Sequence, residues 1–112
     1  MFLSQDSNVP NIYNNILSQL PEEVFSNLLS SGSIRIERIL STGQTSPETG
    51  WYDQHEHEWV IVLQGAGELT FANSDVINLK PGDYLNIPAH THHKVSWTDP
   101  MQVTVWLAVF YT

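Results

Sequence analysis

Cysteine is absent from this chain of 112 residues. Its absence excludes thiolate metal ligands, a cysteine nucleophile and disulfide bonds. It is also compatible with a reducing compartment. Residues 1–6 contain no cationic region and no apolar stretch of the length that a secretory signal peptide needs. We therefore expect a cytoplasmic protein.

Basic residues are scarce, and long apolar runs are missing. Four lysines and arginines stand against twelve acidic residues, which gives a formal net charge of -8. A phosphate backbone would be repelled by such a chain. The longest apolar run, residues 105–111, is far shorter than the roughly 20 residues that cross a bilayer as a helix. We expect neither nucleic acid nor a membrane as a partner.

The first part of the chain has the apolar spacing of helices. Residues 1–10 are polar and are expected to form a loose arm. Between residues 11 and 30, Ile12 and Ile16 are four positions apart, as are Val24 and Leu28. Pro21 suits a first helical turn. We therefore predict that residues 1–33 form an arm and one or two helices, which pack on a barrel formed by residues 34–112.

From residue 34 onward the chain consists of short runs rich in branched and aromatic residues. Turn sequences with Gly, Pro, Asn and Asp separate these runs. This pattern predicts an all-β sandwich or closed antiparallel barrel. The last run is apolar on both faces, so the barrel interior should cover one face and the N-terminal helices or a second subunit the other. The predicted strands are 34–40, 59–63, 68–71, 76–79, 84–87, 93–97 and 102–111.

All five histidines fall in two short windows, residues 55–58 and 90–93. The first window also contains Glu56 and Glu58. Imidazole is the commonest metal ligand in proteins, and a carboxylate beside it is typical of a mixed nitrogen and oxygen site. We prefer a metal site to the alternative that surface loops collected histidines by chance.

Two segments resemble the motifs of the cupin superfamily. Gly82, Pro88 and His93 follow the spacing of the second cupin motif, with His90 where a second glycine is usual. Glu58, six further residues and Gly65 resemble the end of the first motif. The resemblance covers residues 34–111. It implies a cupin double-stranded β-helix, or jelly-roll, barrel that commonly dimerises and holds a metal with three histidines and a glutamate.

The first motif departs from the family pattern. Its two histidines usually precede the glutamate by a spacer of three or four residues, whereas Glu58 directly follows His57. With a three-residue spacer, the family histidine positions fall on Tyr52 and Gln54. Either His55 and His57 enter the barrel from the preceding turn, or Tyr52 and Gln54 occupy the family positions and the two histidines are near-surface extras.

The alternation of side chains along a strand bears on this choice. His55 and His57 should share one face and Glu58 the other, unless a bend or bulge intervenes. In the same way, His93 should face away from His90 and His92, and His92 should face solvent. In the family pattern Glu58 and His93 point inward. The predicted metal ligands are His55, His57, Glu58 and His93, with Gln54 and His90 in reserve.

The resemblance implies a small metal-binding protein that acts on or binds a small polar metabolite. Three imidazoles and a carboxylate suit a divalent Fe, Mn, Ni or Zn ion, with dioxygenase-like or isomerase-like chemistry. The scarcity of basic residues counts against a sugar phosphate. The alternative is a non-catalytic binding module for a sugar or another small ligand. A purely structural protein is a third possibility, and we expect a homodimer in each case.

Overall fold

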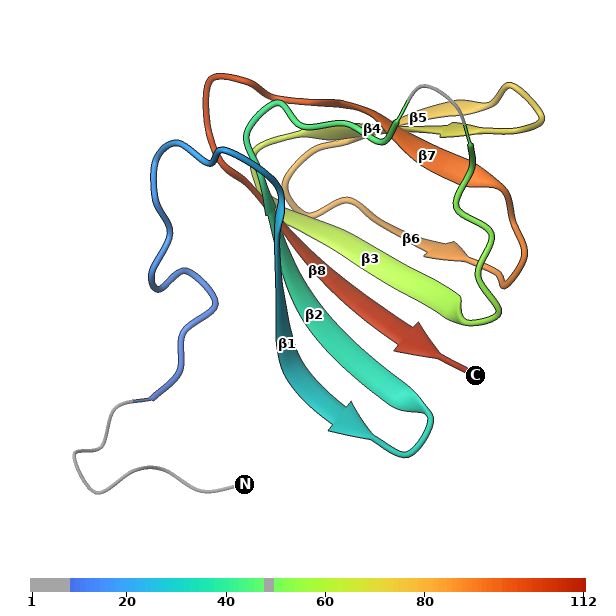
Figure 1. Cartoon of the computed structure of the whole chain (residues 1–112), viewed down its shortest axis with the longest axis horizontal. Helices are drawn as coiled ribbons and strands as arrows, with labels where there is room; N and C mark the ends of the chain where they lie inside the picture. Colours follow the sequence, from blue (N-terminus) through green and yellow to red (C-terminus); the bar gives the residue numbers. More distant parts are fainter. Residues whose placement is uncertain (1–8, 48–49) are drawn as a thin grey trace.

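The computed structural model describes residues 9–47 and 50–112, in which eight strands form two antiparallel sheets (Figure 1). The five-stranded sheet has the order β1-β2-β8-β3-β6, and the three-stranded sheet has the order β5-β4-β7. The all-β jelly-roll class predicted from the sequence is confirmed, and each predicted run contains a strand. The strands are β1 (Val24–Ser31), β2 (Ile34–Ser41), β3 (His57–Gln64), β4 (Gly67–Phe71), β5 (Val76–Leu79), β6 (Tyr84–Ile87), β7 (His93–Thr98) and β8 (Thr104–Tyr111).

The helices predicted over residues 11–30 are wrong. Residues 11–23 form turns and bends, and the residues after them form β1, which pairs with β2 along its whole length. The register of this pair shifts between Asn27 and Leu29, so Leu28 is the extra residue of a β-bulge. Apolar residues four positions apart share one face of a helix and also one face of a strand, so this spacing did not distinguish the two. No helix in the described part of the chain could cross a membrane.

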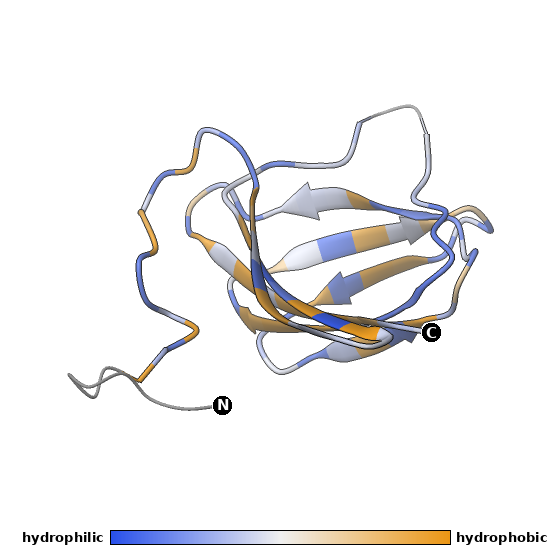
Figure 2. Cartoon of the chain, turned by 60° about the horizontal axis from the view of Figure 1, so that its bottom comes forward, coloured by the Kyte–Doolittle hydropathy of each residue, from blue (hydrophilic) through white to orange (hydrophobic). Residues whose placement is uncertain are grey.

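The main core lies between the two sheets. Trp106, Ala108 and Phe110 of β8 face inward beside Val60 and Val62 of β3. Leu69, Leu79 and Ile87 close the core from the other strands. Figure 2 shows the resulting alternation of polar and apolar residues along the strands.

A second apolar cluster lies on the outer face of the five-stranded sheet. Leu20 of the N-terminal segment packs there against Leu40, Val103 and Val105. Arg38 fastens the same segment, because its Nη1 donates to the carbonyl oxygens of Ile12 and Asn14 at 2.9 and 2.7 Å. The N-terminal segment therefore covers one end of β8 without forming a helix.

Truncation of Leu20 should destabilise the fold, since its side chain is only 8% exposed in this cluster. We expect Leu20→Ala to lower the free energy of unfolding by about 2–3 kcal/mol, measured by urea denaturation. Leu17→Ala is the matched control, because Leu17 belongs to the same segment and is 68% exposed. That change should stay within about 0.5 kcal/mol. Equal effects of the two substitutions would show that the segment does not pack on the sheet.

Candidate functional site

A cavity of about 260 Å³ lies between the inner faces of the two sheets. This volume is close to the lower end of the range of about 300–1,000 Å³ that small-molecule sites occupy. Most of its wall is apolar and is made by Phe25, Ile39, Val60, Leu69, Ile87, Val95, Trp106 and Phe110. The polar side chains that line it are Glu23, Arg35, Tyr52, Gln54, Glu58 and His93.

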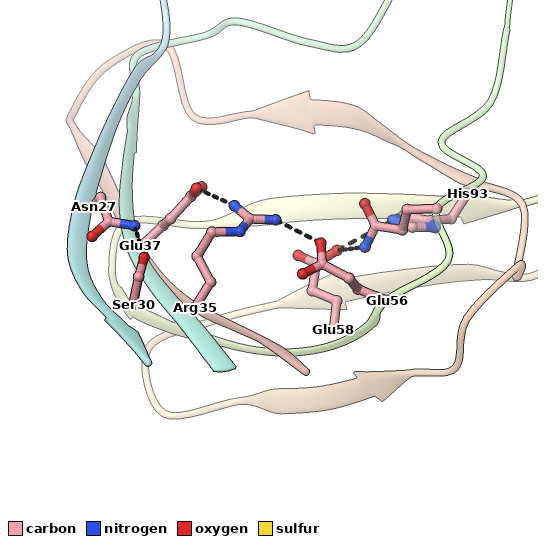
Figure 3. Close-up of polar contacts among 8 residues, drawn as sticks. Asn27, Ser30, Arg35, Glu37, Glu56, Glu58 and His93 are labelled. Carbon is pink, nitrogen blue, oxygen red and sulfur yellow. Dashed lines mark hydrogen bonds and ion pairs between the residues drawn. The ribbon is translucent and has the colours of Figure 1, made fainter. Parts of the chain in front are cut away.

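Glu58 and His93 form the polar centre of this cavity (Figure 3). His93 Nε2 lies 3.6 Å from Glu58 Oε1, and Gln54 Nε2 donates to the same oxygen at 3.3 Å. The other ring nitrogen of His93, Nδ1, lies 2.8 Å from the carbonyl oxygen of Thr91 and donates to it. This bond fixes the ring orientation and directs Nε2 at the carboxylate. Nε2 and the carboxylate therefore lie at ion-pair distance.

The pKa of His93 is raised above its ordinary value, although the residue is only 3% exposed. Burial acts to lower the pKa, because it disfavours the charged ring. The hydrogen bond and charge of Glu58 and the bond to the Thr91 carbonyl act in the opposite direction and prevail. The imidazolium is thus favoured in the folded protein.

The segment before β3 brings Tyr52 and Gln54 to the cavity. Tyr52 and His93 exchange two backbone hydrogen bonds of 2.7 and 3.3 Å, and their rings are 5.5 Å apart. The carbonyl oxygen of Gln54 accepts a bond from the backbone nitrogen of His90 at 2.9 Å. Tyr52 and Gln54 therefore line the cavity beside Glu58 and His93, as in the second of the two sequence alternatives.

The other histidines lie outside the cavity. His55 is exposed, and His57 points away from Glu58, as the alternation along β3 requires. His57 Nδ1 accepts a bond from the backbone nitrogen of Ala89 at 2.9 Å, and its ring lies 5.0 Å from that of Tyr111. The predicted ligands His55 and His57 are therefore not brought to Glu58 and His93.

His90 and His92 also lie outside the cavity. Both lie against Asp53, with ring nitrogens 2.8 and 2.9 Å from its two carboxylate oxygens. Their hydrogen bonds lower the pKa of Asp53. The expectation that His92 faces solvent holds, and the reserve ligand His90 is also exposed. Within residues 9–47 and 50–112, no group of three or more His, Asp or Glu side chains is arranged to hold a metal ion.

The inward direction of Arg35 and Glu37 on β2 was not predicted from the sequence. Ile34 and Ile36 are paired with the outer-facing Tyr111 and Val109, so Arg35 turns toward the cavity. Its guanidinium contacts the carboxylate of Glu37, lies 2.7 Å from that of Glu56, and stacks 4.1 Å above the ring of Phe110 (Figure 3). One feature of the sequence could have indicated this inward direction. Arg35 is two positions from Glu37, so the two share a strand face, in a chain with only four basic residues.

Trp106 forms part of the cavity wall through a close approach to β4. Its Nε1 donates to Ser41 Oγ at 3.0 Å, and its ring lies over Gly67. A Cβ atom at Gly67 would be 2.3 Å from the ring, which no side chain could occupy without displacing the indole. The ring position therefore depends on glycine in β4.

Comparison with known proteins agrees with this geometry. A family model described as a cupin domain matches residues 38–110. The chain belongs to the cupin family. No curated protein shows a significant match to this cupin.

Several solved structures share the fold of this cupin. A protein from Ralstonia eutropha JMP134, named as a candidate mannose-6-phosphate isomerase, is 39% identical, with a TM-score of 0.88, over 93% of this chain and 97% of that one. A cupin superfamily protein from Desulfitobacterium hafniense DCB-2 is 21% identical, with a TM-score of 0.75, over 97% and 94% of the two chains. An RmlC-like cupin with a double-stranded β-helix fold from Methanocaldococcus jannaschii is 15% identical, with a TM-score of 0.66, over 88% and 91%.

Removal of the charge on Glu58 should lower the pKa of His93, because burial would then act with less opposition. We expect this shift in Glu58→Gln, measured by NMR titration of the His93 ring. Glu56→Gln is the matched control, because Glu56 bonds to Arg35 and not to His93. An unchanged pKa in Glu58→Gln would contradict the ion pair.

The same pair should make stability depend on pH. Because the pKa of His93 is raised on folding, the stabilisation is fully present below the unfolded histidine pKa of about 6.5. It is lost as the pH rises through the folded value. The difference in free energy of unfolding between the wild type and Glu58→Gln should therefore shrink from acidic to alkaline pH. A difference that grows with pH would have the wrong sign for this pair.

Proposed function

We propose that this cupin binds a small molecule in the cavity between its sheets and does so without a resident metal ion. The supporting observation is a largely apolar cavity with the Glu58–His93 ion pair in its wall. Small-molecule sites typically combine apolar walls with a few well-placed polar groups. This proposal corresponds to the alternative considered from the sequence, a non-catalytic binding module for a small ligand.

The donor set does not fit the Fe, Mn, Ni or Zn ion expected from the family resemblance. Such a site would take three imidazoles and a carboxylate, but His93 is the one histidine among the residues that line the cavity. Gln54 directs its amide nitrogen at Glu58, and this nitrogen has no lone pair for a metal. Glu58 and His93 compensate each other, so their burial requires no cation.

Fragment binding tests the proposal. We expect some members of a library of small neutral, cationic and anionic fragments to shift the NMR signals of residues lining the cavity. Val95→Phe should abolish these shifts, because the larger ring would fill the space that Val95 lines. Val76→Phe is the control, since Val76 lies on β5 and is exposed. A library without hits, or hits that bind Val95→Phe equally well, would overturn the proposal.

Metal analysis tests the absence of a resident ion. Untagged wild-type protein incubated with Fe, Mn, Ni or Zn should retain far less than one equivalent at this site, measured by mass spectrometry. The double substitution Tyr52→His and Gln54→His should restore the family histidine positions and produce stoichiometric uptake. Adding Glu58→Gln should reverse that gain. Stoichiometric metal in the wild type that His93→Ala removes would contradict the proposal.

We also propose that the protein is a homodimer joined through the outer face of the five-stranded sheet. Beyond the part covered by the N-terminal segment, this face is mostly apolar, and it includes the rings of Trp59 and Tyr84, whose centroids are 5.5 Å apart. A specific dimer typically buries about 1,200–2,000 Å². The apolar residues of the face are Leu29, Ile34, Ile36, Trp59, Ile61, Tyr84, Leu107 and Val109.

A charge on this face should dissociate the dimer. We expect light scattering to give the mass of a dimer for the wild type at micromolar concentration and that of a monomer for Ile36→Lys. Val76→Lys is the control, because Val76 is an exposed apolar residue of the other sheet. A monomeric wild type would contradict the proposed dimer.

A further inference from the structure

The cavity has charged groups at two places. At one of them, Glu58, His93 and Arg35 have partners of opposite charge within the protein, and at the other lies Glu23. Glu58 of β3 is opposite Phe110 of β8, which is in turn opposite Arg35 of β2, so the three residues form one row across the sheet. Phe25, Ile39 and Trp106 form another row, four residues further along β2, or roughly 13 Å at 3.3 Å per residue. Glu23 precedes β1 and lies beyond that second row.

Among the residues that the structure describes, Glu23 lines the cavity without a hydrogen-bond or ion-pair partner. Alternation along β1 puts Glu23 on the same side as Phe25, and both line the cavity. No hydrogen bond or ion pair joins Glu23 to another residue within 9–47 and 50–112. Burial alone raises the pKa of its carboxyl group. A half-buried carboxyl without a partner is a costly group, which a ligand of the right charge would stabilise.

The basic groups of the cavity cannot easily serve an anion. Arg35 is already held by two carboxylates, those of Glu37 and Glu56, and its guanidinium plane rests on Phe110. His93 is held by Glu58 and by the Thr91 carbonyl. Four glutamates therefore stand against one arginine and one histidine around this space, and a carboxylate or phosphate would meet net repulsion.

The walls between the two polar places suit an apolar and flat body. Phe25 and Trp106 lie in the row next to Glu23, and Phe110 lies in the row of Glu58. Aromatic faces attract cations as well as apolar groups, most strongly where water is excluded. The same residues therefore favour an aromatic or aliphatic body and an attached positive charge.

We propose that Glu23 makes this cavity selective for an organic cation, an amine attached to an aromatic or aliphatic body, with its ammonium group at the Glu23 carboxylate. This inference rests on the proposed function, because it names the class of molecule that the same cavity takes. Glu23 precedes the region that the cupin family model matches, residues 38–110.

Three probes with the same aromatic body and different charge test the selectivity. They are 2-phenylethylamine, 2-phenylethanol and 3-phenylpropionate, titrated into the full chain and followed by NMR. We expect the amine to bind with a Kd about tenfold or more below those of the alcohol and the acid, the size of effect that a hydrogen bond to a charged group supplies. Val95→Phe should abolish binding of the amine.

Variants of Glu23 assign the preference to this carboxylate. Glu23→Gln should weaken binding of the amine by about tenfold and leave the alcohol unchanged. Glu23→Asp keeps the charge and should keep the preference. Glu22→Gln is the matched control, because Glu22 is the exposed neighbour. Thermal unfolding checks that each variant is folded, and glutamine removes the charge of a half-buried carboxylate, so Glu23→Gln should not lose stability.

Other results of these titrations would overturn the selectivity for a cation or its assignment to Glu23. If the alcohol or the acid binds as tightly as the amine, the charge selectivity is overturned while ligand binding in the cavity stands. If Glu23→Gln keeps the preference, the assignment to Glu23 is overturned. If no probe binds, or if the amine binds Val95→Phe equally well, the selectivity proposal fails. The fragment screen then decides separately whether the cavity binds small molecules at all.

Discussion

The central constraint on this molecule is that β8 is paired along both edges, buried on its inner face and covered at one end of its outer face. It is the middle strand of the five-stranded sheet, hydrogen bonded to β2 on one side and β3 on the other. Its inward residues Trp106, Ala108 and Phe110 form the main core, while Val105 belongs to the outer cluster with Leu20. Because β8 sets the register of both neighbours, it also determines that Arg35 and Glu58 lie in one row across the sheet.

Strand content could be predicted from the sequence wherever the turn residues were clear. The runs from residue 34 onward all became strands, because Gly, Pro and Asp separate stretches that have few alternatives to a sheet. The N-terminal segment was mispredicted for a specific physical reason. Apolar residues four positions apart lie on one face of a helix and also on one face of a strand, so the spacing of Val24 and Leu28 did not separate the two.

Part of the candidate site could also be predicted, and the rest depended on tertiary pairing. The inward direction of Glu58 and His93 followed from the motifs and the alternation of side chains. The roles of His57 and Arg35 did not, because His57 bonds to the backbone of Ala89, and Arg35 faces inward between two isoleucines. Three of the clustered histidines, His57, His90 and His92, bond to neighbouring loop residues in this structure.

The close approach of Trp106 to Gly67 has a consequence for how the cavity evolves. The indole is part of the cavity wall, yet its resting position is set by the missing side chain of a residue that is not in the wall. Replacement of that glycine would displace the ring, and with it part of the cavity wall, without changing the identity of any residue that lines the cavity. The shape of this cavity is therefore controlled from the neighbouring sheet, at a position where a comparison of cavity residues alone would find no difference.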